Sequence, residues 1–237
     1  AHIGSGVVAA DVTHEFIIHV PAIRSAAITD TGPYTVGSGV TTSLTIPFEN
    51  TGNDVSSYVL SIGDGLPDDW TVTITTATIS NLSAQMEAWP LDDDRQQTDF
   101  TLDVLTSENT SSGTFQDIPI RVQDEVTGVL LFETNVIVQV EPRVAFHLTP
   151  LEQEVNLSVY EQPSTRVFIH NTGNLLTNFN VWIDDSAAGD VIFSMETSEN
   201  LLIPAGFNDS VKIRLSPDSQ ASADDVHQIT VWVEADG

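Results

Sequence analysis

The feature that most constrains this fold is a short turn, Asn-Thr-Gly-Asn, which the chain contains twice between alternating apolar segments. It lies in FENTGN at 48–53 and in IHNTGN at 169–174. At an offset of 121 positions, five apolar residues coincide with the parity of one strand face. The pairs are Ile46 and Val167, Phe48 and Ile169, Tyr58 and Phe179, Leu60 and Val181, and Ile62 and Ile183. Because Asn and Gly suit tight reversals, we predict a repeated strand-turn-strand unit.

The rest of the chain also consists of short apolar segments separated by Gly, Pro, Asn, Asp and Ser. Most of them alternate with period two, and no long window has a helical apolar stripe. The predicted strands are EFIIHV (15–20), TSLTIPF (42–48), WTVTITTATI (70–79), DFTLDVL (99–105), IPIRV (118–122), VLLFETNVIVQV (129–140), STRVFIH (164–170), FNVWI (179–183), SVKIRL (210–215) and QITVWVEA (228–235). The predicted class is all-β, and frequent turns favour sandwiches.

The duplication predicts two tandem domains. We place their boundary at Glu141-Pro142-Arg143, where a proline separates a closing strand from an opening one. The first domain is then 13–141, with loop insertions near 80–98 and 106–117, and the second is 142–237. The phrases IIHVP (17–21) and AFHLTP (145–150) are similar, which suggests that each domain opens with the same strand and kink. So short a junction predicts a stiff pair.

Residues 1–12 precede the first predicted strand. They contain a Gly-Ser-Gly hinge and an apolar VVAA patch. Three interpretations remain open for them: a frayed tail, an extra strand of the first sandwich, or a strand donated to a neighbouring subunit.

The second unit resembles the immunoglobulin-like CARDB modules of archaeal and bacterial surface proteins, and related modules appended to galactosidases. Those modules have a strand, an N-T-G-N turn, a strand, a phrase of apolar-Pro-Ala-Gly-polar type and a final strand. Leu201 to Pro217 fit that phrase, whereas the first unit matches only at FENTGN, YVLSI and LPDDW. The resemblance implies two tandem immunoglobulin-like β-sandwiches and a cell-surface setting, and no particular activity.

The charge balance excludes two classes of partner. There are 34 acidic residues against 7 basic ones, a formal net charge of −27. Such a chain cannot neutralise the phosphates of a nucleic acid, nor is it attracted to an anionic membrane. Because salt screens this self-repulsion, we expect a salt-adapted, halophilic protein.

Two further absences in the sequence limit its chemistry and its membrane contact. The chain has no cysteine, which excludes disulfides and thiolate ligands. No apolar run approaches the roughly 18 residues of a membrane helix, so we expect no direct membrane insertion. No secretory signal opens the chain, and we expect a mature chain or an excised ectodomain.

Clusters of acidic residues are the candidate metal ligands. They lie in GDGLPDDW and in LDDDRQQTD, and the candidates are Asp64, Asp68, Asp69, Asp92, Asp93 and Asp94. Calcium takes six to eight oxygen ligands, which Asp-rich loops can supply. None of these loops has the D-x-[DN]-x-[DN]-G pattern, and runs of Asp are ordinary on the solvated turns of so acidic a chain. Beyond possible calcium we expect no cofactor.

No catalytic constellation is recognisable in the sequence. The six histidines are scattered, without an HExxH motif or a G-x-S-x-G elbow, and nothing pairs particular carboxylates across a cleft. We therefore expect no enzyme activity.

Surface contacts with glycans form the last group of candidates. Trp89, in the insertion EAWPLDDD, is the best candidate for a contact aromatic, while Trp70 is expected in the core and Trp182 and Trp232 are ambiguous. N-x-[ST] sequons, the acceptors expected in a surface glycoprotein, occur at Asn81, Asn109, Asn156 and Asn208.

Together these observations predict a non-catalytic, structural or adhesive module of an extracellular surface protein, from a salt-adapted and archaeal setting. One alternative is a subunit of a polymeric surface filament or layer, assembled by N-terminal strand donation. Another is a carbohydrate-binding accessory module. The expected partners are other surface proteins or copies of this chain, with glycans as a further class.

Overall fold

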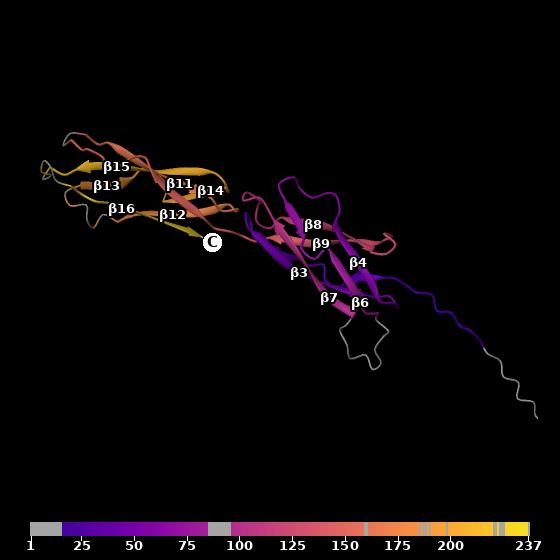
Figure 1. Ribbon diagram of the computed structural model, residues 1–237. Coiled ribbons are helices and arrows are strands. Elements are labelled where there is room, and N and C mark those ends of the chain that lie inside the picture. Colours follow the sequence, from indigo (N-terminus) through magenta and orange to yellow (C-terminus); the bar gives the residue numbers. More distant parts are fainter. Residues whose placement is uncertain are drawn as a thin grey trace, which may run out of the picture.

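The described part of the chain consists of β-strands joined by turns. The computed structural model describes residues 16–84, 96–158, 161–184, 186, 189, 191–197, 199–219, 222 and 226–236 (Figure 1). These residues form strands β1 to β16 and no α-helix, which confirms the all-β prediction. None of them belongs to a helix with the length and hydrophobicity to span a membrane.

Strands β1 to β9, the first unit, form two sheets around one core. One sheet has the order β1-β3-β7-β5: β1 (Ala26–Ile28), β3 (Thr41–Asn50), β7 (Gln97–Leu105) and β5 (Thr71–Ile74). The other has the order β2-β9-β8-β4-β6: β2 (Tyr34–Val36), β9 (Leu130–Val140), β8 (Phe115–Asp124), β4 (Ser56–Ile62) and β6 (Thr78–Leu82). Alternate residues of these strands point inward, as the period-two pattern requires.

Strands β10 to β16, the second unit, form two further sheets. One has the order β10-β11-β15-β13: β10 (Phe146–Pro150), β11 (Ser164–Asn171), β15 (Asn208–Pro217) and β13 (Val191–Met195). The other has the order β14-β12-β16: β14 (Asn200–Ile203), β12 (Thr177–Asp184) and β16 (Thr230–Asp236). This unit encloses a hydrophobic cluster separate from that of the first unit. The division into two tandem immunoglobulin-like domains stays a prediction.

The two units correspond strand by strand. The matching pairs are β1 and β10, β3 and β11, β4 and β12, β5 and β13, β6 and β14, β7 and β15, and β8 and β16. In the described residues, β2 and β9 have no counterpart strand in the second unit. The second unit is therefore the first without the parallel pair that closes one sheet.

The long segment WTVTITTATI, predicted as one strand, is two. Residues Thr71–Ile74 form β5 and pair with β7, whereas Thr78–Leu82 form β6 and pair with β4 in the opposite sheet. The chain crosses between the sheets at Thr75–Ala77, because each half completes a different sheet edge.

The similarity of IIHVP and AFHLTP does not mark equivalent strands, so that interpretation is wrong. β10 pairs with β11 from Phe146 opposite Asn171, and the strand that pairs in this way in the first unit is β1, from Ala26 opposite Asn50. Residues 16–20, predicted as part of a strand, are exposed and belong to no strand of the described chain. Figure 1 shows them leading away from the strands of the first unit. Residues 1–12, for which three interpretations remain open, lie outside the described residues.

Candidate functional site: two chain clamps and an open sheet edge

The first asparagine of each repeated turn fixes the turn from inside. The buried Asn50 side chain donates from Nδ2 to the carbonyl oxygens of Asp54 (2.9 Å) and Leu82 (3.0 Å), and its Oδ1 accepts from the Gly52 N–H (2.9 Å). Asn171 makes the same three bonds, with Leu175 O (2.9 Å), Ile203 O (2.8 Å) and Gly173 N (2.9 Å). The sequence repeat is thus a repeat of buried hydrogen bonds.

The last asparagine of each turn holds the chain that enters the unit. Asn53 Oδ1 accepts from Ile23 N (2.6 Å), its N–H donates to Ile23 O (3.1 Å), and its Nδ2 donates to Pro21 O (3.1 Å). Asn174 forms the same set, with Arg143 N (2.7 Å), Arg143 O (3.0 Å) and Glu141 O (2.9 Å). We call Asn50–Asn53 the first clamp and Asn171–Asn174 the second clamp.

The glycine of each clamp allows the entering chain to lie against the turn. A Cβ on Gly52 would overlap the carbonyl oxygen of Ile23, and a Cβ on Gly173 would overlap that of Arg143. These glycines are required for close backbone approach, since neither position has a left-handed φ.

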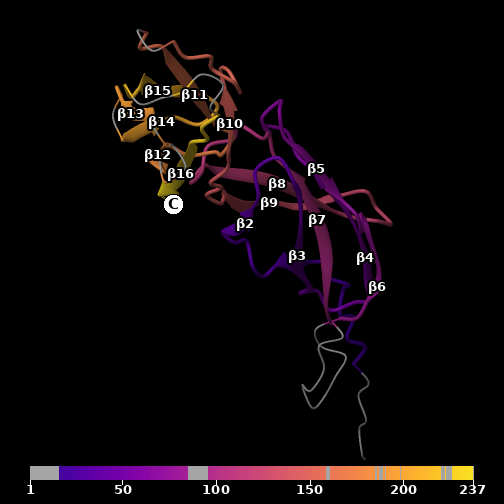
Figure 2. The ribbon, with the colours of Figure 1, turned by 90° about the vertical axis from the view of Figure 1, so that its left-hand side faces the viewer.

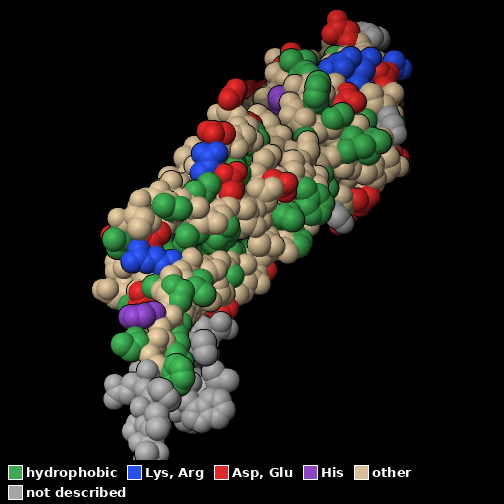
Figure 3. Space-filling view, turned by 90° about the vertical axis from the view of Figure 1, so that its right-hand side faces the viewer, with side chains coloured by type: hydrophobic (Ala, Val, Ile, Leu, Met, Phe, Trp, Pro, Cys, Tyr) green, Lys and Arg blue, Asp and Glu red, His purple; other side chains and the backbone are tan. Residues whose placement is uncertain are grey.

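The segments before the two clamps are equivalent at an offset of 120 positions. Before the second clamp lies the end of β9, whose inward residues Val136, Val138 and Val140 are 0%, 0% and 1% exposed. Before the first clamp the matching residues are Phe16 (84%), Ile18 (83%) and Val20 (75%). The chain thus has a second apolar segment that resembles the end of β9 but packs on no core. In Figure 3, hydrophobic side chains follow one another along the narrow lower end of the molecule.

The second unit is open where β9 closes the first. β16 matches β8 at an offset of 111 positions, because β12 and β4 pair with them in the same order. The inward residues of β8, Ile118, Ile120 and Val122, are fully buried. Their counterparts on β16 and just before it, Ile229, Val231 and Val233, are only partly buried. In the described chain β16 pairs with β12 alone, so its other edge is free of a partner strand.

The segment that corresponds to β2 also lacks its strand partner among the described residues of the second unit. β2 pairs in parallel with β9, with Tyr34 opposite Val138 and Val36 opposite Val140. At the 121-position offset the matching segment is Val155–Leu157, which packs both apolar side chains against the second core but forms no strand. In the described chain no strand pairs with it.

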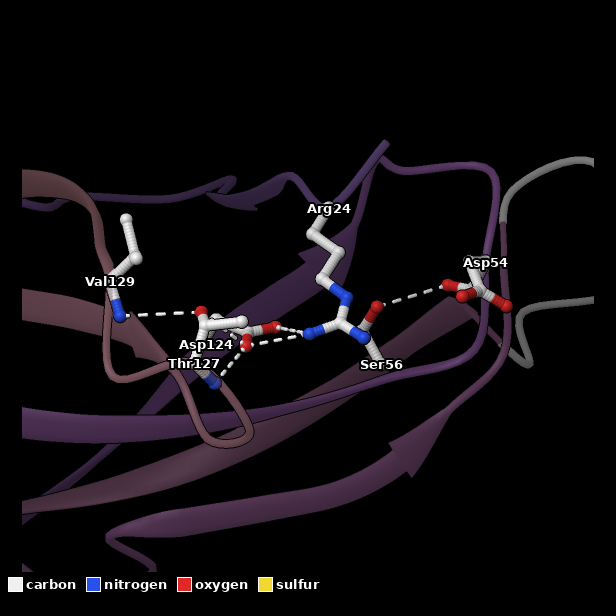
Figure 4. Close-up of polar contacts among 6 residues, drawn as sticks. All are labelled: Arg24, Asp54, Ser56, Asp124, Thr127 and Val129. Carbon is white, nitrogen blue, oxygen red and sulfur yellow. Dashed lines mark hydrogen bonds and ion pairs between the residues drawn. The ribbon is translucent and has the colours of Figure 1, made fainter. Parts of the chain in front are cut away.

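An ion pair anchors the segment that passes through the first clamp. Arg24 Nη1 lies 2.8 Å and 3.0 Å from the two carboxylate oxygens of the buried Asp124 (Figure 4). Oδ1 of Asp124 also accepts from the N–H and hydroxyl of Thr127, both at 2.7 Å. The Thr127 hydrogen bonds, followed by the Arg24 charge, hold the pKa of Asp124 below its ordinary value.

The described calcium candidates are exposed side chains. Asp64 is exposed and pairs with Arg121 at 3.2 Å, and Asp68 and Asp69 are exposed on the turn before Trp70. Among the described residues no three His, Cys, Asp or Glu side chains gather closely enough to hold a metal ion. Asp92, Asp93 and Asp94 lie outside the described residues. Calcium binding by the chain stays a prediction.

The sequons all lie on the surface. Asn81 is on β6 with φ 54°, Asn109 in the turn after β7, Asn156 between β10 and β11, and Asn208 at the start of β15. All four side chains are exposed. They are accessible to a glycosyltransferase, and their modification stays a prediction.

The tryptophans divide between core and surface. Trp70 is buried in the first core, as expected. Trp182 and Trp232, 44% and 51% exposed, face each other across β12 and β16 with ring centroids 6.4 Å apart and planes inclined by 13°. This stacked pair is a surface aromatic site that the sequence left ambiguous. Trp89 lies outside the described residues.

Comparison with known proteins assigns no family. No family of known sequences matches the chain, and no curated protein matches it. Among solved structures, a protein of unknown function from Porphyromonas gingivalis W83 is 14% identical, over 81% of this chain and 83% of its own, with a TM-score of 0.33. The CsuC-CsuE complex of a chaperone and a tip adhesion subunit from Csu pili of Acinetobacter baumannii is 10% identical, over 90% and 100%, with a TM-score of 0.46. The Escherichia coli adhesin FdeC is 12% identical, over 82% and 56%, with a TM-score of 0.35. Likenesses this low define neither a family nor an activity.

Proposed function

We propose that this chain is a non-catalytic structural module of an extracellular surface protein, which holds β-sandwich units in line at a fixed spacing. The observation that carries the proposal is the second clamp. All four polar groups of the buried Asn174 are used there, since its carbonyl oxygen also accepts from Ser112 N (3.0 Å) in the first unit. One residue therefore ties the junction to both units.

The surface chemistry supports a structural role in salty surroundings. The net charge is −27, and in Figure 3 carboxylates are scattered along the visible face among few basic groups. Salt shortens the range of their repulsion, to a Debye length of about 3 Å at 1 M. A salt-adapted, archaeal surface with glycans on the four sequons is the setting that we propose, with other surface proteins or copies of this chain as partners.

The proposal is tested by measuring how firmly the junction is held. Because the chain has no cysteine, Thr73→Cys and Ser194→Cys place one spin label on each unit, both at exposed positions. Double electron–electron resonance should give a narrow distribution of the distance between the two labels in this doubly labelled parent chain. Adding Asn174→Ala should broaden the distribution, and adding the matched control Asn53→Ala should leave it unchanged. A broad distribution in the parent would overturn the proposed role as a rigid link.

The stacked tryptophans favour a second function, contact with a glycan. Sugar rings stack on exposed aromatic faces, and Trp182 and Trp232 present a pair of them on one sheet. Retention on polysaccharide gels should be lost on Trp182→Ala if the pair binds sugar. Equal migration of the parent chain with and without polysaccharide would exclude it.

A further inference from the structure

We propose that residues Phe16–Val20 of one copy of this chain bind along the free edge of β16 in a second copy, and so close its second unit. This rests on the proposed structural function and names its partner, a second copy of the chain. The binding strand takes the place that β9 has in the first unit. Repeated at each end, the contact joins copies head to tail.

The apolar segment at residues 16–20 lacks a core to pack on, and the described residues of the second unit provide no strand for the free edge of β16. Phe16, Ile18 and Val20 are exposed by 75% or more, whereas the equivalent β9 residues are wholly buried. The second unit has a partly covered apolar face on β16 and an apolar segment, Val155–Leu157, without a strand partner. Bringing them together removes both exposed surfaces from water and gives the edge N–H and C=O groups of β16 a partner strand.

The first unit defines the direction and register of the contact. β9 runs antiparallel to β8, with Val136 opposite Ile118, and parallel to β2, with Val138 opposite Tyr34. Transferred by the offsets of 120, 111 and 121 positions, Phe16 lies opposite Ile229 and Ile18 opposite Val155. Phe16, Ile18 and Val20 then point into the second core, and Ile17 and His19 point to solvent.

The position of residues 16–20 favours binding to another copy of the chain. Arg24, Asn53 and Gly52 hold residues 21–25 on the first unit, and Figures 1 and 2 show the chain before them leading away from the side where β10 to β16 lie. A segment held in this way cannot reach β16 of its own chain. After binding β16 of a neighbour it would pass directly into the first clamp of its own copy, as β9 passes into the second clamp.

Adjacent isoleucines provide a matched test on the full chain. Ile17→Asp and Ile18→Asp make the same chemical change at residues that are both 83% exposed, so neither should alter folding of the free chain. By light scattering at about 1 M NaCl, the unmodified chain and Ile17→Asp should form assemblies, and Ile18→Asp should raise the dissociation constant about 100-fold. A monomeric unmodified chain, or equal masses for the two variants, would overturn the proposal.

Cross-linking tests the register independently. When a Phe16→Cys chain and an Ile229→Cys chain are mixed and oxidised, a disulfide-linked heterodimer should form, because the Cα atoms of the equivalent Val136 and Ile118 are direct partners. Replacing the donor by Ile17→Cys should abolish it. Equal yields from the two donors would refute the register. The spin-label distances within one chain do not depend on this contact, so failure here is separable from failure of the rigid-link function.

Discussion

Asn50 and Asn171 each donate one side-chain hydrogen bond to a carbonyl 32 positions further along, at Leu82 and Ile203. Each also accepts one bond from the glycine two positions on. Since both side chains are buried, removing either takes a donor from two carbonyls and an acceptor from one N–H. The carbonyls of Asp54 and Leu175 keep a second donor, the hydroxyl of Ser56 or Thr177.

Asn50→Ala and Asn171→Ala should therefore each cost about 3 kcal/mol of unfolding free energy. Urea unfolding of each variant against the unmodified chain measures this. Asn208→Ala, at an exposed position, is the control and should change stability by less than about 0.5 kcal/mol. A cost below about 1 kcal/mol in either buried variant would show that the turn is held by its backbone alone.

Gly52→Ala and Gly173→Ala should each release the chain that passes through one clamp. The new methyl group overlaps a carbonyl oxygen of the entering segment, which must move away from the turn. Limited proteolysis with trypsin measures this release, because trypsin cleaves after Arg, and Arg24 lies in one segment and Arg143 in the other. We expect faster cleavage after Arg24 in Gly52→Ala and after Arg143 in Gly173→Ala. Each variant is the other's control, and cleavage at the same rate at both sites would contradict this assignment.

The Arg24–Asp124 pair should make stability depend on acid pH. The pKa of Asp124 is lowered in the fold, chiefly by Thr127 and then by Arg24. Its contribution is thus complete above the unfolded value near 3.9, and is lost as pH falls through the folded pKa. Asp124→Asn should be less stable than the unmodified chain at pH 7, by about 2 kcal/mol for hydrogen bonds to a buried carboxylate, and the gap should narrow below about pH 4. A gap that is the same at pH 7 and pH 3 would show that the charge contributes nothing.

Val122 and Val233 occupy equivalent positions in the two units, but their side chains are buried to different extents. Val122 is fully buried on β8, which has β9 beside it in the sheet, whereas Val233 is partly exposed on the edge strand β16. Val122→Ala should cost about 2–3 kcal/mol and Val233→Ala about 1 kcal/mol or less in a dilute monomer. Thermal unfolding at low protein concentration compares them. Equal costs would indicate that the second core is already closed.

The strand class was predictable because apolar alternation survives in almost every segment. Five coincidences around Asn50 and Asn171 predicted that β3-β4 and β11-β12 are equivalent, and their inward residues are buried or partly buried in both units. The crossing at Thr75–Ala77 was missed because both halves of WTVTITTATI have the strand pattern. Only the pairing of each half shows that they belong to different sheets.

The clamps could have been found from the sequence only in part. An offset of 120 places FIIHVPAIRSA on VIVQVEPRVAF, but the phrase IIHVP also resembles AFHLTP, and short apolar strings do not decide between such alignments. The hydrogen bonds of Asn53 and Asn174 decide it. The stacking of Trp182 on Trp232 depends on cross-strand register, which the sequence does not fix.

Because both clamps grip the backbone with the same atoms, a joint between two copies would have the geometry of the joint inside each copy. Low-resolution averaged images of such a fibre would then show sandwiches at one uniform axial spacing, although the two units of each polypeptide differ in their strands. The boundaries between successive molecules would be invisible at low magnification, and a break in covalent continuity would leave the stiffness of the fibre unchanged along its length.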